Sequence, residues 1–337
     1  MKLRTALLAT TIAVSSLLGG CSRNRQEAAI LANQGDQEVK LNVDGAIQKY
    51  ENASRMDPTN HRIFFKLAMA YRKKEDWDKA ASTLSRAVQL APKFANYWFE
   101  RGYALEQQAK KKTIQWDEAK EPFTKCVEAD PNYAECYEEL GNIFLWTDDE
   151  QRALDNYSKA VEHDPSNVAY YNVLADLYIR LGYVKEAEQI LKSAKDAPMP
   201  VAPAPKEKKD DGEGNEAKAK DKAAAEAANK KAARDKSLYG THILLAQVYQ
   251  DRGSQAEQVA ELEAAKSIVP AEGPEAITIL YQLGSTYAVM NPPRSAEAIS
   301  MLKGFNGRAC KSAKASQYKA ECETSQALVN KLGGSLQ

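Results

Sequence analysis

Residues 61–94 read HRIFFKLAMAYRKKEDWDKAASTLSRAVQLAPKF, and this stretch decides the fold. Two apolar patterns at helical spacing follow one another and end at a proline: Phe64, Leu67, Ala68 and Tyr71, then Ala80, Leu84, Ala87 and Pro92. The spacing predicts two amphipathic helices joined by a short turn, and the proline ends the second helix.

The second half of this stretch recurs along the chain at a nearly fixed step. Five alanines lie 34, 39, 34 and 34 residues apart, at Ala46, Ala80, Ala119, Ala153 and Ala187. Four prolines keep the same step, at Pro58, Pro92, Pro131 and Pro165. A period of this length predicts stacked helical hairpins, each unable to bury its apolar face without its neighbours.

The pattern of aromatic, Leu, small, Tyr, then Ala, aromatic, Ala and Pro resembles the tetratricopeptide repeat. It is clearest in residues 61–94, 134–167 and 168–198. The resemblance implies an all-α fold, a right-handed superhelical array of antiparallel helix pairs (an α-solenoid). Residues 95–133 carry five extra residues near the turn, so we expect longer helices or a longer turn there. The first unit matches only in its second helix, which suits an N-terminal cap.

Composition divides the chain further. We expect a signal peptide at residues 1–20, an array of about five repeats at 21–198, and about two weaker repeats with a capping helix at 238–337. The linker at 199–237 begins with prolines, and residues 206–236 contain 18 charged side chains and almost no large apolar ones. Such a segment cannot bury a core, so it is expected to be disordered or transiently helical. The alternative is an electrostatic docking segment.

The N-terminus resembles a bacterial lipoprotein signal. Lys2 and Arg4 precede an uncharged apolar stretch that is too short for a permanent membrane span, and Leu18-Gly19-Gly20-Cys21 resembles a lipobox. The resemblance implies that Cys21 is lipidated and anchors the mature chain in a membrane. The alternative is an ordinary secretory signal with an incidental cysteine.

Localisation and charge follow from the same region. Ser22 in place of aspartate favours the outer membrane, so the protein is expected in the cell envelope, facing the periplasm. The full chain has 46 basic and 46 acidic residues. This balance gives no reason to expect a nucleic-acid partner.

The other four cysteines form two pairs that are close in sequence. Cys310 and Cys322 are twelve residues apart, and Cys126 and Cys136 are ten apart. In an exported protein, pairs at such separations are candidate disulfides. Cys126 also occupies the small-residue position of its repeat, where a buried free thiol would serve equally well. None has the spacing of a metal site.

The resemblance also places the candidate binding residues, because the first helix of each pair lines the concave face in this family. The second and third units contribute Arg62, Phe65, Met69, Arg72, Lys73, Asn96, Phe99, Tyr103 and Glu106. The fourth and fifth contribute Glu135, Glu138, Asn142, Leu145, Trp146, Asn172, Asp176, Ile179 and Arg180.

Four of these residues are aromatic and are expected to form a strip that holds an extended or helical peptide: Phe65, Phe99, Tyr103 and Trp146. The alternative is that other parts of the chain cover the strip. Basic residues collect on the second unit and acidic residues on the fourth, which predicts a defined polarity for the partner. The lysine and asparagine set with which chaperone-binding members grip a C-terminal carboxylate is absent from these positions.

An enzyme is not indicated. His61, His163 and His242 lie far apart and at different places in the repeat. The sequence has no phosphate-binding glycine loop, paired-histidine metal motif or nucleophile elbow. We therefore expect no cofactor, metal or small-molecule substrate.

The predicted function is that of a membrane-anchored periplasmic scaffold. Similar lipoproteins bind protein or peptide partners during assembly of outer-membrane barrels, secretins or motility machinery. The alternative is a recruiter or regulator of peptidoglycan-active enzymes.

Overall fold

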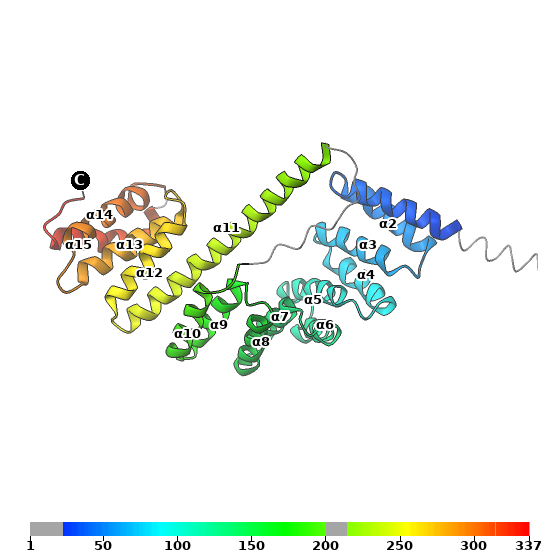
Figure 1. The fold of residues 1–337 in the computed structure, drawn as a ribbon, viewed down its shortest axis with the longest axis horizontal. Coiled ribbons are helices and arrows are strands. Elements are labelled where there is room, and N and C mark those ends of the chain that lie inside the picture. The colour runs from blue at the N-terminus through cyan, green and yellow to red at the C-terminus, as the bar shows by residue number, and fades with distance from the viewer. Residues whose placement is uncertain (1–22, 200–213, 314, 337) are drawn as a thin grey trace, which may run out of the picture. The chain divides into compact units, whose positions relative to one another are not determined.

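The computed structural model describes residues 23–199, 214–313 and 315–336, and within these ranges the chain is built of helices (Figure 1). The contacts divide the chain into two compact units, one up to His163 and one from Asp164. We call them unit 1 and unit 2. The prediction of an all-α array of stacked helix pairs is confirmed.

Unit 1 contains four helix pairs. Residues 23–38 are helical and pack against α2 (Val43–Met56). The other three pairs are α3 (His61–Lys73) with α4 (Trp77–Leu90), α5 (Ala95–Lys110) with α6 (Trp116–Ala129), and α7 (Ala134–Trp146) with α8 (Glu150–His163).

Unit 2 continues the same plan. It pairs α9 (Val168–Arg180) with α10 (Val184–Lys195), α11 (Gly214–Asp251) with α12 (Gln255–Ile268), and α13 (Pro274–Val289) with α14 (Ser295–Phe305). Two short helices, η1 (Asn306–Cys310) and η2 (Ala315–Tyr318), lead to the terminal α15 (Lys319–Lys331). In the described ranges, no helix combines the length and apolarity needed to cross a bilayer.

In several pairs the helices approach closely where a glycine of the first helix faces a large side chain of the second, which is a ring in some pairs and Leu302 in the α13–α14 pair. A Cβ built on Gly102 would lie 2.8 Å from the Phe123 ring, and one on Gly141 would lie 2.6 Å from the Tyr157 ring. Both rings are buried. In these two pairs, the repeating small position and the repeating aromatic position of the sequence are therefore the two halves of one contact.

The five extra residues of the third pair divide between its helix and its turn. Helix α5 has 16 residues, whereas α3 and α7 have 13 each. Residues 111–115 join α5 to α6, whereas residues 74–76 join α3 to α4. Both alternatives left open by the sequence thus contribute, three residues to the helix and two to the turn.

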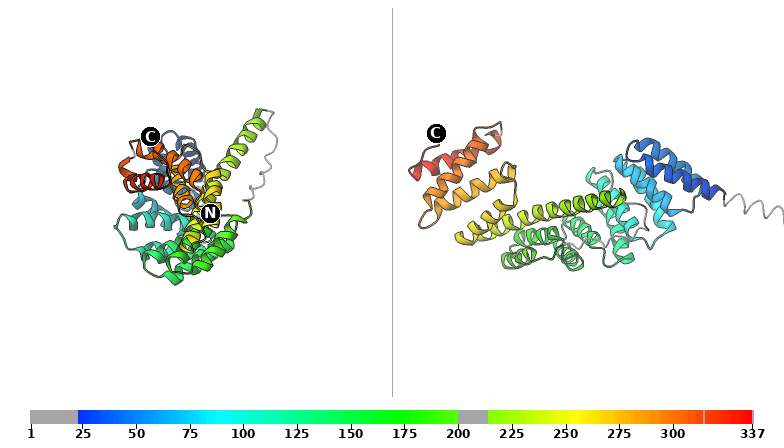
Figure 2. Two further views of the ribbon diagram at one scale, coloured as in Figure 1. Left: turned by 90° about the vertical axis from the view of Figure 1, so that its left-hand side faces the viewer. Right: turned by 45° about the horizontal axis from the view of Figure 1, so that its top comes forward.

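The structure differs from the predicted boundaries around the linker. Residues 200–213 lie outside the described residues, but from Gly214 the chain is one helix of 38 residues. This helix, α11, crosses the predicted boundary at 238 without a break, and it contacts α9, α10 and α12 (Figures 1 and 2). Its alanine and lysine content favours helix, and its apolar second half serves as the first helix of the next pair.

Side chains of unit 2 hold α11 in place. The Asn172 amide donates to the Ser237 carbonyl and accepts from the Thr241 hydroxyl, both at 2.8 Å. Glu261 of α12 binds Lys195 at 2.7 Å and also binds His242 of α11. Burial alone would raise the pKa of Glu261, but the hydrogen bonds from His242 and Lys195 lower it.

We predict that Gly141→Ala destabilises unit 1 by about 1–3 kcal/mol, because the added methyl group overlaps the buried Tyr157 ring. All four tryptophans (Trp77, Trp98, Trp116 and Trp146) lie in unit 1, so urea unfolding followed by tryptophan fluorescence measures this effect. Ser158→Ala, at an exposed position of the same helix pair, is the control and should leave the midpoint nearly unchanged. Equal midpoints for Gly141→Ala and the wild type would contradict the close-contact explanation.

Candidate functional site

The predicted binding residues of unit 1 lie on α3, α5 and α7, the first helices of their pairs. We call the surface that these helices form the first-helix face. Arg62, Lys73, Asn96, Glu135 and Trp146 are exposed on it. The other predicted residues are half-buried, except Glu106, which is buried.

The predicted aromatic strip is largely occupied by contacts within the chain. Phe65 stacks on Tyr97 with ring centroids 4.5 Å apart. Phe99 packs against Phe123 and Tyr133 in a core cluster, with centroid distances of 5.9 and 5.6 Å. Phe99 therefore supports the fold, and it is unsuitable as a reporter of binding.

Trp146 is the predicted aromatic residue that solvent reaches most freely. Its side chain is 60% exposed, and its ring lies parallel to that of Trp116 at a centroid distance of 5.3 Å. Trp116 is the first residue of α6 and was not among the predicted residues. The stacking on Trp116 orients the Trp146 indole and leaves its outer face accessible.

A polar pocket lies between α3 and α5. It has a volume of about 590 Å³, and its lining includes Met69, Arg72, Lys73, Trp77, Tyr103 and Lys111. Arg72 donates to Glu100 at 2.6 Å, and its guanidinium lies 4.7 Å from the centre of the Tyr103 ring. Burial raises the pKa of Glu100, and the adjacent Arg72 opposes that rise.

Carboxylates dominate the face between α5 and α7. Burial, together with the charges of Glu139, Glu135 and Glu106, raises the pKa of Glu138 to about 7. Burial and the charge of Glu106 also raise the pKa of Glu139, although a hydrogen bond from Asn142 and the charge of Lys110 oppose this. Adding more negative charge here is therefore unfavourable, and a cation would be stabilised.

Asn142 has a structural role at this site. Its side-chain oxygen accepts from the Tyr157 hydroxyl at 2.7 Å, and its amide donates to Glu139 at 2.9 Å. The residue thus links the small-and-aromatic contact of the α7–α8 pair to the acidic group.

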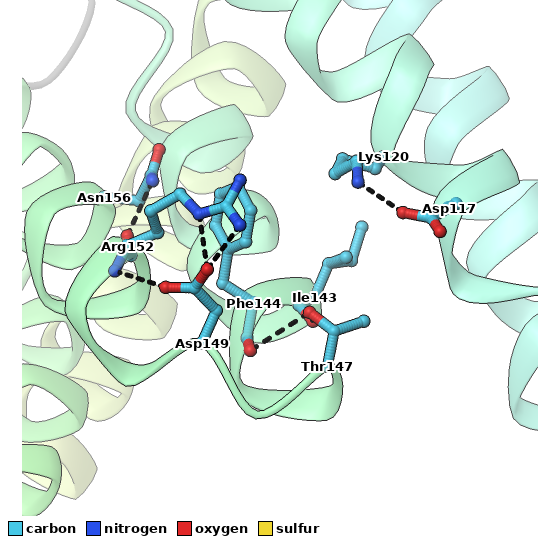
Figure 3. Close-up of polar contacts among 8 residues, drawn as sticks. All are labelled: Asp117, Lys120, Ile143, Phe144, Thr147, Asp149, Arg152 and Asn156. Carbon is cyan, nitrogen blue, oxygen red and sulfur yellow. Dashed lines mark hydrogen bonds and ion pairs between the residues drawn. The ribbon is translucent and has the colours of Figure 1, made fainter.

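The turn after Trp146 is fixed by its own hydrogen bonds (Figure 3). The Thr147 hydroxyl donates to the Ile143 carbonyl at 3.0 Å, and Asp149 accepts from the Arg152 backbone N–H at 3.1 Å at the start of α8. The Arg152 guanidinium also binds Asp149 and lies 4.7 Å from the centre of the Phe144 ring. These contacts hold the end of α7, and with it Trp146, in one position.

The predicted residues of the fifth repeat belong to α9 in unit 2. Arg180 is exposed and forms an ion pair with Asp176 at 3.3 Å. Asn172 is engaged with Ser237 and Thr241, so it serves the attachment of α11.

Comparison with known proteins agrees with this architecture. The family model described as tetratricopeptide repeat matches residues 42–100 and 147–198. The chain contains tetratricopeptide repeats. Proteins built of these repeats bind protein or peptide partners, and they are typically scaffolds without catalytic activity.

Solved structures show the same fold at low sequence identity. The C-terminal part of a TPR repeat-containing protein from Cytophaga hutchinsonii aligns with 85% of this chain and 98% of its own, at 12% identity and a TM-score of 0.59. PilF from Pseudomonas aeruginosa aligns with 77% of this chain and 99% of its own, at 13% identity and a TM-score of 0.50. A weaker likeness, on which the fold assignment does not rest, is to MamA from Desulfovibrio magneticus RS-1, which aligns with 51% of this chain and 94% of its own, at 18% identity and a TM-score of 0.45.

The remaining candidate residues lie in separate places. Cys126 is bonded to Cys136, and Cys310 of η1 is bonded to Cys322 of α15. Cys21 lies outside the described residues, so its lipidation stays a prediction. His61 contacts Tyr97, His163 stacks on Tyr137, and His242 binds Glu261.

Sequence reasoning missed Glu139 on the first-helix face and Trp116 of α6, which lies beside that face. Glu139 is adjacent to the predicted residue Glu138. It occupies the same place in its repeat as Glu100, which binds Arg72 of the preceding first helix. The charge of Glu106, also on the preceding first helix, raises the pKa of Glu139. An alignment of the repeats with one another shows that Glu100 and Glu139 occupy equivalent positions, and this is the signal that could have identified Glu139. Trp116 gives no comparable signal, because it belongs to a second helix.

We predict that Glu138→Gln raises the melting temperature of unit 1 at pH 8 and leaves it unchanged near pH 4. The pKa of Glu138 is higher in the folded chain, at about 7, than its ordinary value of 4.5, so its ionisation opposes folding. That cost is absent below about pH 4.5 and complete above about pH 7. Tryptophan fluorescence melts across this range measure the difference. Glu128→Gln, at an exposed position of α6, is the control, and an equal response of both variants would refute the assignment.

Proposed function

We propose that this protein is a membrane-anchored scaffold of the bacterial cell envelope, whose first-helix face binds partner proteins during assembly of an envelope complex. The observation that carries the proposal is the composition of that face. It combines the exposed Trp146, which stacks on the half-buried Trp116 of the neighbouring α6, with basic side chains on α3 and acidic side chains on α7. Flat aromatic surfaces and separated opposite charges are features of protein-binding surfaces.

The charge separation favours one direction of binding. Arg62 and Lys73 are exposed on α3, whereas Glu135 is exposed and Glu138 half-buried on α7. A partner segment that crosses from α3 to α7 lies against basic side chains at one end and against acidic side chains at the other. Its acidic end therefore belongs over α3 and its basic end over α7.

The proposed location rests on the N-terminal sequence. Leu18-Gly19-Gly20-Cys21 resembles a lipobox, and Ser22 favours transfer to the outer membrane. The two bonded cysteine pairs suit an oxidising compartment such as the periplasm. Envelope assemblies of this kind include barrels, secretins and motility machinery, and we place the scaffold in this class.

Site-specific photocrosslinking in cells tests the binding face. We expect a crosslinking amino acid at Asn96 or Glu135, both exposed on first helices, to capture a specific partner. The same amino acid at Thr124 of α6 or Ser158 of α8, both exposed on second helices, is the matched control. Mass spectrometry then identifies the captured proteins. Capture of the same partners only from α6 and α8 would refute the first-helix face. Peptidoglycan enzymes among the captured set would favour the role of an enzyme recruiter over that of an assembly scaffold.

Fractionation of the cell envelope tests the anchor. We expect Cys21→Ala to abolish incorporation of labelled fatty acid and to release the protein from the membrane fraction, because the acyl chains supply the anchoring free energy. Ser22→Ala keeps the cysteine and is the control. A Cys21→Ala protein that stayed membrane-bound and normally processed would exclude lipid anchoring.

A further inference from the structure

Two equivalent places on the first-helix face carry opposite charge arrangements. Arg72 on α3 and Glu100 on α5 form an ion pair between successive first helices. One repeat further on, Glu106 on α5 and Glu139 on α7 occupy the corresponding positions, counted from the aligned helix starts at His61, Ala95 and Ala134. The first place pairs a cation with an anion, whereas the second brings two carboxylates together.

Glu106 is incompletely satisfied at this second place. Its side chain is only 2% exposed, and its Oε1 atom binds the Lys110 ammonium at 3.0 Å. Its Oε2 atom is buried without a hydrogen-bond partner. A buried carboxylate oxygen without a donor is costly, so this site lacks a hydrogen-bond donor that the described residues do not supply.

Lys110 pairs with Glu106, but the carboxyl groups around Glu106 leave this region with excess negative charge. The negative charge of Glu106 raises the pKa of both Glu138 and Glu139, so the three carboxyl groups share one region of the face. From α5, Lys110 is the cation that acts on the group, and from α7, Asn142 donates to Glu139 while Glu135 adds further negative charge. One ammonium group therefore faces several carboxyl groups.

We propose that Glu106, Glu138 and Glu139 form an acceptor site for a lysine or arginine side chain of the partner segment. The proposal deepens the function above and rests on it. Glu138 and Glu139 are half-buried and form the accessible part of the site, and Glu106 contributes a buried oxygen without a hydrogen-bond partner from the preceding first helix. A bound cation would complete here the arrangement that Arg72 completes within the chain at the preceding repeat.

The chemistry of the site favours an organic cation over a metal ion. Among the described residues, no group of three or more His, Cys, Asp or Glu side chains has an arrangement that fits a metal ion. A guanidinium offers several N–H donors in one plane, and an ammonium offers three, which suits acceptors contributed by two neighbouring helices. The site lies at the acidic end of the face, where the proposed binding direction places the basic end of the partner.

The test uses a fluorescein-labelled hexa-arginine peptide and anisotropy titrations at physiological salt. We expect Glu138→Gln/Glu139→Gln to weaken binding about tenfold or more, because two acceptors lose their charge without a large change in shape. The matched control is Glu128→Gln/Glu162→Gln, which removes two exposed carboxylates from α6 and α8 of the same unit. The control should change the affinity by less than about twofold, since exposed charges contribute little.

A second variant separates binding from folding defects. Glu139→Arg places at the second site the ion pair that Arg72 and Glu100 form at the first. We expect it to raise the melting temperature of unit 1 and to abolish peptide binding, because the new guanidinium occupies the place of the ligand. A correctly folded Glu139→Arg protein that bound the peptide as tightly as the wild type would overturn the proposal.

Binding should also depend on pH in a specific sense. Because the pKa of Glu138 is about 7, we expect the wild type to bind the peptide more tightly at pH 8 than at pH 6. The Glu138→Gln/Glu139→Gln variant should lose most of this dependence. An equal pH dependence in the variant, or an equal loss of affinity in the charge-matched control, would show only general electrostatic attraction and overturn the site.

The photocrosslinking experiment distinguishes failure of this inference from failure of the proposed function. If crosslinks from Asn96 and Glu135 persist at full strength in the Glu138→Gln/Glu139→Gln protein, the face binds the partner but the cation site is wrong. If the wild type shows no crosslinks from the first-helix face, the proposed function itself fails.

Discussion

A close contact between a small residue of one helix and a large buried side chain of the next holds helix pairs together, and the stacking of the pairs depends on it. Gly102 and Gly141 lie so close to Phe123 and Tyr157 that a methyl group would overlap the rings. This contact sets the separation of the two helices in a pair. The remaining apolar surface is then buried against the next pair, so each unit gains stability from its neighbours.

This packing also determines which side chains stay available for binding. Phe99 lies on a first helix, yet its ring is taken up by Phe123 and Tyr133, so its position in the repeat is a poor guide to exposure. Trp146 keeps one face free because it stacks on a single neighbour at the end of α7. The proposed binding surface therefore consists of the groups that internal packing leaves accessible, namely the tryptophan pair and the charged side chains.

The charged side chains on the first-helix face also differ in whether other residues of the chain pair with them. Arg72 and Glu100 compensate each other within the chain, whereas Glu106 and Glu139 occupy equivalent positions and do not. Lys110 is the cation that pairs with Glu106, so the excess of carboxyl groups and the unpartnered oxygen of Glu106 lower the stability of this part of the array. Tyr157 and Asn142 connect this acidic group to the packing contact of their helix pair, which holds the carboxylates in place.

Most of the fold could be predicted from periodicity, because the spacing of Ala80, Leu84, Ala87 and Pro92 records which face of a helix is buried and where the helix ends. This local pattern also predicts the second helices, the small positions and the five extra residues after Glu106. Local pattern does not show how far a helix continues, so the unbroken course of α11 through residue 238 emerged only from its contacts with α9, α10 and α12. The local pattern also does not show which rings pack against Phe99, or that one carboxylate oxygen of Glu106 has no hydrogen-bond partner. These features depend on side chains from different repeats that meet in space, and their distances are set by packing between the helix pairs.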